Sequence, residues 1–216
     1  MYNPPHFRID DRDGQRAFMD AHPLAQLVTE TPSGITANPV PLLYGPSPEP
    51  LGLLRGHLAR ANPQWRDSRL DRPALAIFQG AQAYISPSWY AEKAATGRVV
   101  PTWNYTTLHV YGRLAIHDNP DWLRAFLTDL TARHEGGRAA PWAITDAPED
   151  YIARQLKGIV GFEVTIERIE AKAKLSQNRN EADRSGVVTG LRNETDPLAR
   201  VTGEQVAENL ANSPKR

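Results

Sequence analysis

Apolar and polar side chains alternate along much of the chain, and this pattern predicts many short strands. The clearest alternation spans residues 107–116, where one face carries Leu108, Val110, Leu114 and Ile116. Shorter extended segments are predicted at residues 24–29, 35–43, 51–54, 74–78 and 83–85, with clusters rich in Pro, Gly and Ser between several of them. We expect a break at Gln79-Gly80 to separate the last two segments.

A slip in the alternation within residues 163–175 predicts a β-bulge. Val164 and Ile166 share one parity, whereas later apolar residues, from Ile169 to Leu175, share the other. A shift of one residue moves every later side chain to the opposite face, so we place the bulge near Glu167-Arg168. Beyond the bulge, one face is expected to carry Glu170, Lys172, Lys174 and Ser176.

Helices are predicted at intervals between the strands. Residues 15–21 have the pattern of a short helix that ends before Pro23. A longer helix begins after the capping residue Asn119, with Pro120 at its first position, and ends before Gly136. A further helix is expected to begin near Asp146, where Asp146 and Glu149 have the spacing of a capping box, and to run toward residue 158.

The C-terminal part has the pattern of surface helices at residues 181–191 and 202–210, the second with Thr202 and Gln205 as a candidate capping box. No aromatic residue follows Phe162, so we expect this part to contribute little core. The elements lack the regular strand–helix alternation of a parallel sheet. The predicted fold class is therefore mainly β with helices (α+β), an antiparallel barrel with appended helices.

Composition and charge exclude several kinds of protein. The 216 residues include no Cys, which excludes disulfides, a thiolate nucleophile and thiolate-bound metals. Lys plus Arg and Asp plus Glu are balanced at 25 each, which argues against a strongly basic nucleic-acid binder. No apolar run is long enough for a membrane span, and the first residues lack the apolar stretch of a signal peptide, so we expect a cytoplasmic protein.

Two small groups of cations are candidate anion sites. Residues 55–72 hold five Arg against two Asp, a local charge of +3 that indicates either a solvated turn or a patch suited to one phosphate. Lys172, Lys174 and Ser176 form the second group, by the same reasoning. Groups of this size suit a phosphorylated small molecule better than a DNA backbone.

Aromatic residues gather in stretches that we interpret as loops. The stretch Val100-Pro101-Thr102-Trp103-Asn104-Tyr105 and the stretch from Tyr84 to Tyr90 could stack on a planar ring, with Thr102 and Asn104 bonding to its edge, or could be ordinary core. The six His residues have no metal-ligand spacing, so no metal is expected. No G-x-S-x-G, Walker or G-x-G-x-x-G sequence occurs, which leaves hydrolase, P-loop and Rossmann readings without support.

Several motifs together resemble the PaiB family, whose members are described as FMN-binding negative transcriptional regulators. They follow the order expected for that family: GHLARANPQW (56–65), FQGAQAYISPSWY (78–90), VPTWNY (100–105), HVYGRL (109–114), IVGFEV (159–164) and KAKLSQN (172–178). The resemblance runs from Met1 to about Leu191, which would make residues 1–191 an FMN-binding domain and 192–216 a partly helical tail. One departure is Ala37-Asn38-Pro39, where relatives often carry a His-x-Pro pattern, so any role of a histidine there is lost.

The resemblance implies a split β-barrel of the flavin-reductase and pyridoxamine-oxidase type, normally a homodimer with FMN between its subunits. It assigns the FMN pocket to the motifs GHLARANP (56–63) and KLSQN (174–178). It places residues 102–105 beside the flavin ring or a second ligand. The candidate residues are His57, Arg60 and Asn62; Lys174, Ser176, Gln177 and Asn178; and Thr102, Trp103, Asn104 and Tyr105.

The resulting hypothesis is an FMN-binding regulator that acts on transcription directly or indirectly. Direct DNA binding has little support, because the helices near Trp122 and Ile152 are joined by a long link and surrounded by acidic residues. The alternatives are a flavin-dependent oxidoreductase or flavin reductase that uses the same cofactor, and a flavin or haem binding module without turnover.

Overall fold

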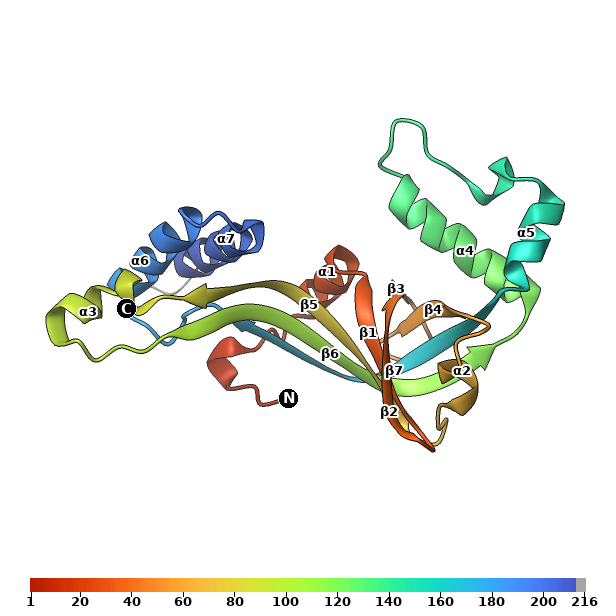
Figure 1. Ribbon diagram of the computed structural model, residues 1–216, viewed down its shortest axis with the longest axis horizontal. Coiled ribbons are helices and arrows are strands. Elements are labelled where there is room, and N and C mark those ends of the chain that lie inside the picture. The colour runs from red at the N-terminus through yellow and green to blue at the C-terminus, as the bar shows by residue number, and fades with distance from the viewer. Residues whose placement is uncertain (213–216) are drawn as a thin grey trace. The chain divides into compact units, whose positions relative to one another are not determined.

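The computed structural model describes residues 1–212 and contains one seven-stranded sheet with helices around it (Figure 1). The strands follow the order β2-β1-β5-β6-β7-β4-β3, and each strand pair with a determined register is antiparallel. The strands are β1 (Leu24–Thr31), β2 (Gly34–Pro41), β3 (Leu43–Gly45), β4 (Leu53–Ala59), β5 (Pro73–Ile85), β6 (Thr102–His117) and β7 (Ile159–Lys174). This architecture confirms the predicted α+β fold with an antiparallel sheet.

Seven α-helices and three short 3-10 turns are present in the described residues. The helices are α1 (Arg12–Ala21), α2 (Gln64–Asp67), α3 (Ala91–Thr96), α4 (Pro120–Glu135), α5 (Glu149–Leu156), α6 (Glu181–Arg192) and α7 (Pro197–Ala211). The 3-10 turns are η1 (Pro5–Phe7), η2 (Pro87–Trp89) and η3 (Ile144–Asp146). No helix among residues 1–212 is long and apolar enough to cross a membrane.

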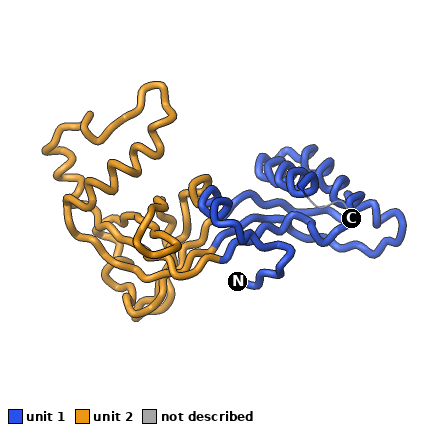
Figure 2. Tube along the Cα trace, turned by 180° about the vertical axis from the view of Figure 1, so that it is seen from behind, with its two compact units in different colours: residues 1–18, 79–108, 170–216 blue, residues 19–78, 109–169 orange. Residues whose placement is uncertain are grey.

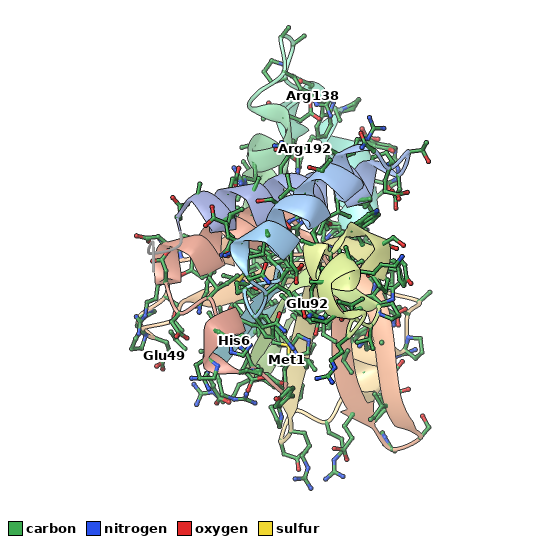
Figure 3. The ribbon with its side chains drawn as sticks, turned by 90° about the vertical axis from the view of Figure 1, so that its left-hand side faces the viewer. Met1, His6, Glu49, Glu92, Arg138 and Arg192 are labelled. Atoms are coloured by element: carbon green, nitrogen blue, oxygen red, sulfur yellow. The ribbon has the colours of Figure 1, made fainter. Side chains whose placement is uncertain are left out.

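The chain divides into two compact units, drawn in different colours in Figure 2. Unit 1 comprises residues 1–18, 79–108 and those from 170 onward, and unit 2 comprises residues 19–78 and 109–169. Strands β5, β6 and β7 each contribute residues to both units. Helices α6 and α7 both belong to unit 1, so residue 191 does not divide these units.

Unit 2 has a core of large side chains from its strands and from α4. Its fully buried residues include Leu27, Leu54, Phe78, Val110, Phe126, Val160 and Phe162. A second cluster, made by Leu123, Ile144, Ile152 and Leu156, packs α4 against η3 and α5. Asn119 begins α4 as predicted, because its side chain accepts hydrogen bonds from the backbone N–H groups of Asp121 and Trp122.

Unit 1 has a core that the sequence reading underestimated. Aliphatic side chains of α6 and α7 pack against β5 and the segment after β7, so the expectation of little C-terminal core is wrong. The helical spacing of small aliphatic residues lets α6 and α7 bury this surface, although neither helix carries an aromatic residue. The buried members of the cluster are Ala83, Ile85, Tyr90, Leu175, Val187, Val188, Leu191, Ala199 and Val206.

Two strands extend beyond their predicted limits. The predicted break at Gln79-Gly80 is wrong, since β5 continues through both residues. The stretch that begins at Thr102 is the start of β6 and not a loop. The sequence did not reveal this strand, because a mixture of aromatic and polar side chains hides its alternation. Glu167 and Arg168 are both exposed within one continuous strand β7, and the bulge placed there stays a prediction.

Two predicted capping boxes do not form. Asp146 ends η3, where its carboxylate accepts from the backbone N–H of Ala143 at 2.8 Å, and α5 begins three residues later, after Pro148. Thr202 lies inside α7 and donates to the carbonyl of Leu198, and Asp196 caps that helix instead. A proline marks both true starts better than the side-chain spacing does, since Pro148 directly precedes α5 and Pro197 is the first residue of α7.

Candidate functional site

Two of the candidate stretches come together in unit 1, between the start of β6 and the end of β7. The Lys174 ammonium donates to the Thr102 hydroxyl and, at 2.8 Å, to the backbone carbonyl of Trp103. The Asn104 amide donates to the Ser176 hydroxyl at 2.9 Å. Because β6 and β7 are neighbours in the sheet, these contacts join residues far apart in the sequence. Asn104 and Ser176, for example, are 72 positions apart.

The segment after β7 is a tight turn held by its own side chains. Ser176 is buried and has a φ of 64°, a left-handed conformation that few residues other than glycine adopt. Gln177 accepts from the Leu175 N–H and donates to the Ala173 carbonyl, both at 2.7 Å, which occupies its oxygen and its nitrogen. Gln177 therefore shapes the turn, and Asn178 is the exposed residue of the motif.

Asn104 lies beneath this turn and is fully buried. Its Nδ2 donates to Ser176, and its Oδ1 has no hydrogen-bond partner among the described residues. Because the Asn104 side chain is buried and its one hydrogen bond goes to Ser176, it is placed to support that residue and not to contact a ligand. We interpret Asn104 as the residue that holds Ser176 in place.

Three cations lie close together at this turn. Burial, and then the charges of Lys172 and Arg179, lower the pKa of Lys174. Lys172 is itself buried, donates to the Tyr2 carbonyl at 3.1 Å, and lies between 5.3 and 5.7 Å from the ring centres of Tyr2, Phe7 and Tyr105. No carboxylate among the described residues forms an ion pair with any of the three cations.

Exposed aromatic side chains accompany these cations. Tyr84 on β5 and Trp103 on β6 are 48% and 53% exposed, and their rings meet edge to face with centres 6.1 Å apart. Because large aromatic side chains are usually buried, this exposed pair offers a planar surface to a ligand or a partner. Tyr105 is only partly exposed and contacts Lys172.

The remaining candidates, His57, Arg60 and Asn62, lie in unit 2 and have structural partners there. Arg60 binds both oxygens of Asp118, at 2.5 and 3.0 Å, and donates to the carbonyls of Lys157 and Ile159. Asn62 accepts from the N–H of Gln64 at the start of α2. These contacts account for both residues without a ligand, and their assignment to the FMN pocket stays a prediction.

His57 lies on β4 with its ring centre 5.8 Å from that of Phe126. Its Nδ1 is buried and has no hydrogen-bond partner among the described residues, and burial lowers the pKa of this histidine. A lowered pKa favours the neutral imidazole, which is a poor ligand for phosphate.

The basic stretch of residues 55–72 loses most of its excess charge in the fold. Arg55 pairs with Asp129 at 2.8 Å, Arg60 with Asp118, and Arg69 with Glu30 and Asp71. Carboxylates distant in sequence supply most of these partners, so a local count of charges could not foresee them. This stretch is a weaker anion site than the turn after β7.

Asn38, in the segment Ala37-Asn38-Pro39, is held by a hydrogen-bond network. Its amide donates to Gln64 Oε1 at 2.8 Å, and Gln64 in turn donates to the Leu27 carbonyl and the Thr29 hydroxyl, each at 3.0 Å. This buried network joins β2, α2 and β1. Asn38 therefore has a structural role of its own in this chain.

The sequence reading missed Arg179, which follows the KLSQN motif directly. Its guanidinium carbon lies 4.5 Å from the ring centre of Tyr90, and its backbone N–H donates to the Ser176 carbonyl at 2.9 Å. The charge pattern KLSQNR could have indicated it. Among residues 1–212, no group of three or more His, Asp and Glu side chains could hold a metal ion.

The fold is that of a split-barrel protein of the flavin-reductase and pyridoxamine-oxidase type. Solved structures with this fold include the FAD and heme binding protein from Mycobacterium smegmatis, with a TM-score of 0.55 and 17% identity over 77% of this chain and 73% of that one. The flavocytochrome Anf3 from Azotobacter vinelandii has a TM-score of 0.58 and 13% identity over 83% of this chain and 75% of that one. At such identities the likeness concerns the fold alone.

Sequence comparison then identifies the family. The family described as "Putative FMN-binding domain" matches residues 1–168. The protease synthase and sporulation protein PAI 2 of Bacillus subtilis is 34% identical over 210 residues, covering 97% of this chain and 98% of that protein. The chain belongs to the PaiB family of FMN-binding proteins, and its cofactor is FMN.

Proposed function

We propose that FMN binds at the turn after β7, and that the protein is a flavin-dependent negative regulator of transcription. The observation that carries the proposal is the group of cations without carboxylate partners beside the exposed Tyr84–Trp103 pair. Cations suit a phosphate group and an aromatic surface suits the flavin ring, so the residues present fit FMN. When bound, FMN supplies the redox chemistry, which the side chains of a cysteine-free protein do not.

Within this proposal, Lys174 binds the phosphate and the Ser176 hydroxyl donates to it. Trp103 and Tyr84 contact the ring system, and Asn104 and Gln177 hold the turn. We further propose a homodimer in which a second copy covers the exposed aromatic pair. Its mass in solution, measured by sedimentation, tests this part separately from cofactor binding.

The regulatory role rests on membership of the PaiB family. We propose that the regulation is indirect, through the state of the flavin. Helices α4 and α5 are separated by residues 136–148, unlike the short connection of a helix-turn-helix, and they carry Asp121, Asp129, Glu149 and Asp150. A DNA mobility shift that depends on salt and sequence would instead favour a direct repressor.

Lys174→Ala tests the location of the cofactor. Loss of a charge-assisted hydrogen bond costs about 1.5–3 kcal/mol, so we expect FMN to bind roughly 10- to 100-fold more weakly. The quenching of flavin fluorescence on titration with protein measures this affinity. Lys157→Ala, at an exposed lysine in unit 2, is the control and should leave the affinity unchanged.

Two results would contradict the proposal in different ways. If the natural protein neither contains flavin as isolated nor quenches added FMN, binding itself fails. If FMN binds equally well to the natural protein and to Lys174→Ala, the site lies elsewhere.

A second candidate function is a flavin-dependent oxidoreductase. The observation that favours it is the exposure of Tyr84 and Trp103, which leaves a planar surface open to a second ring compound. Oxidation of NADH or NADPH faster than with the same concentration of free FMN would support this activity. Equal rates with and without the protein would exclude it for these two donors.

A further inference from the structure

Arg179 is fixed in place although its side chain forms no ion pair with any residue in the described range, 1–212. Its backbone N–H donates to the Ser176 carbonyl, and its guanidinium lies over the ring of Tyr90. Tyr90 is only 3% exposed and belongs to the core of unit 1, so it is a rigid support. The position of the guanidinium is therefore set by the turn on one side and by an aromatic ring on the other.

No carboxylate among the described residues forms an ion pair with Arg179. Its positive charge lowers the pKa of Lys174, as does that of Lys172, so the three cations act on one another. The nearby Asp183 is 1% exposed, and its Oδ1 accepts from the backbone N–H of Glu92 at 2.9 Å. Like charges held together without a counterion favour the binding of an anion.

Other arginines in the described residues bind a carboxylate through their guanidinium groups. Arg60 and Arg192 each bind both oxygens of a carboxylate, from Asp118 and Glu204. A guanidinium presents the same donors equally well to a phosphate. Arg179 has the same donors, and within residues 1–212 no carboxylate forms an ion pair with them.

Lys172 and Arg179 differ in access. Lys172 is 6% exposed and donates to the Tyr2 carbonyl, so it acts on the site through its charge alone. Arg179 is partly exposed and stands next to the motif that carries Lys174 and Ser176. A ligand at this turn can therefore contact Lys174 and Arg179 together.

We propose that Arg179 is a phosphate-binding residue that works with Lys174, and that the pair makes the site select FMN over riboflavin, which lacks the phosphate. This inference rests on the proposed function. The planar guanidinium of Arg179 adds a second set of donors beside Lys174, whose pKa is lowered by burial and by the charges of Lys172 and Arg179.

The test compares FMN and riboflavin binding to Arg179→Gln by fluorescence quenching. We expect FMN affinity to fall at least 10-fold and riboflavin affinity to change less than 2-fold, so the preference for FMN collapses. Arg179→Lys keeps the charge but not the planar pair of donors, and should give an intermediate preference. Arg98→Ala, at an exposed arginine of the same unit, is the matched control and should behave as the natural protein.

The outcomes separate this inference from the proposed function. If the natural protein does not bind FMN, the proposed function fails. If FMN binds but Arg179→Gln leaves its affinity unchanged, or weakens FMN and riboflavin equally, then Arg179 does not recognise the phosphate. Far-ultraviolet circular dichroism of each variant verifies folding, and Arg179→Lys supplies the measurement if the glutamine variant does not fold.

Discussion

At the residue scale, Ser176 is the most constrained position of the candidate site. A left-handed conformation costs a residue other than glycine about 1–2 kcal/mol, so the surrounding contacts must compensate for it. Asn104 and Gln177 supply those contacts. The sequence identified all three residues as candidates, but a linear pattern could not reveal that Asn104 bonds to Ser176 from a different strand.

Asn104→Ala tests this arrangement. The substitution removes the bond to Ser176 and leaves a buried hydroxyl without its donor, so we expect the free energy of unfolding to fall by about 1–3 kcal/mol. Urea denaturation followed by fluorescence measures the change. Asn178→Ala, at an exposed residue of the same motif, should stay within about 0.5 kcal/mol, and an equal effect of the two substitutions would contradict the assigned role.

At the scale of elements, β5 and β7 show how far the alternation of side chains can be trusted. Buried positions of β5 change from even to odd between Phe78 and Ala81, whereas in β7 the adjacent exposed pair Glu167-Arg168 is followed by two adjacent buried residues, Ala171 and Lys172. The sequence pattern suggested a break in β5 where the strand only changes face, and the bulge placed near Glu167-Arg168 in β7 stays a prediction. Backbone pairing with neighbouring strands keeps the strand continuous, and that pairing is invisible in a single segment.

Helix α6 depends on a close contact that requires glycine. A Cβ at Gly190 would lie 2.3 Å from the ring of Trp89, so Gly190→Ala must displace the indole. We expect a loss of about 1–3 kcal/mol from overpacking, larger than the gain of roughly 1 kcal/mol in helix propensity. Thermal denaturation should show a lower Tm.

Gly137→Ala is the control, because nothing lies within 4 Å of the Cβ that it would add. A Tm for Gly190→Ala at or above that of the natural protein would mean that the helix and η2 are not packed this closely.

At the scale of the whole molecule, the C-terminal helices complete unit 1. Val206 of α7 is fully buried beside Leu191 of α6, although the family match ends at residue 168. The sequence predicted the helices but not their packing, because the aliphatic residues that make this core are small and widely spaced. The candidate site lies next to this core, since Leu175 belongs to the core and the following residue, Ser176, belongs to the site.

Val206→Ala measures this contribution. Deleting buried methyl groups removes transfer energy and leaves a cavity, so we expect a loss of roughly 2 kcal/mol of unfolding free energy. Val201→Ala, at a residue of the same helix that is 49% exposed, should change stability by less than about 0.5 kcal/mol. Equal values for the two variants would show that α7 does not contribute to the core.

The segments of the two units alternate along the chain, and this order determines which contacts can form during synthesis. The chain passes from one unit to the other after residues 18, 78, 108 and 169, so neither unit is a continuous segment. During synthesis, every residue of unit 2 is made before α6 and α7. Synthesis adds about 5–20 residues per second. Ala83 and Ile85 are therefore made several seconds before the helices that cover them. During this interval the new chain exposes apolar surface that favours aggregation or the binding of chaperones.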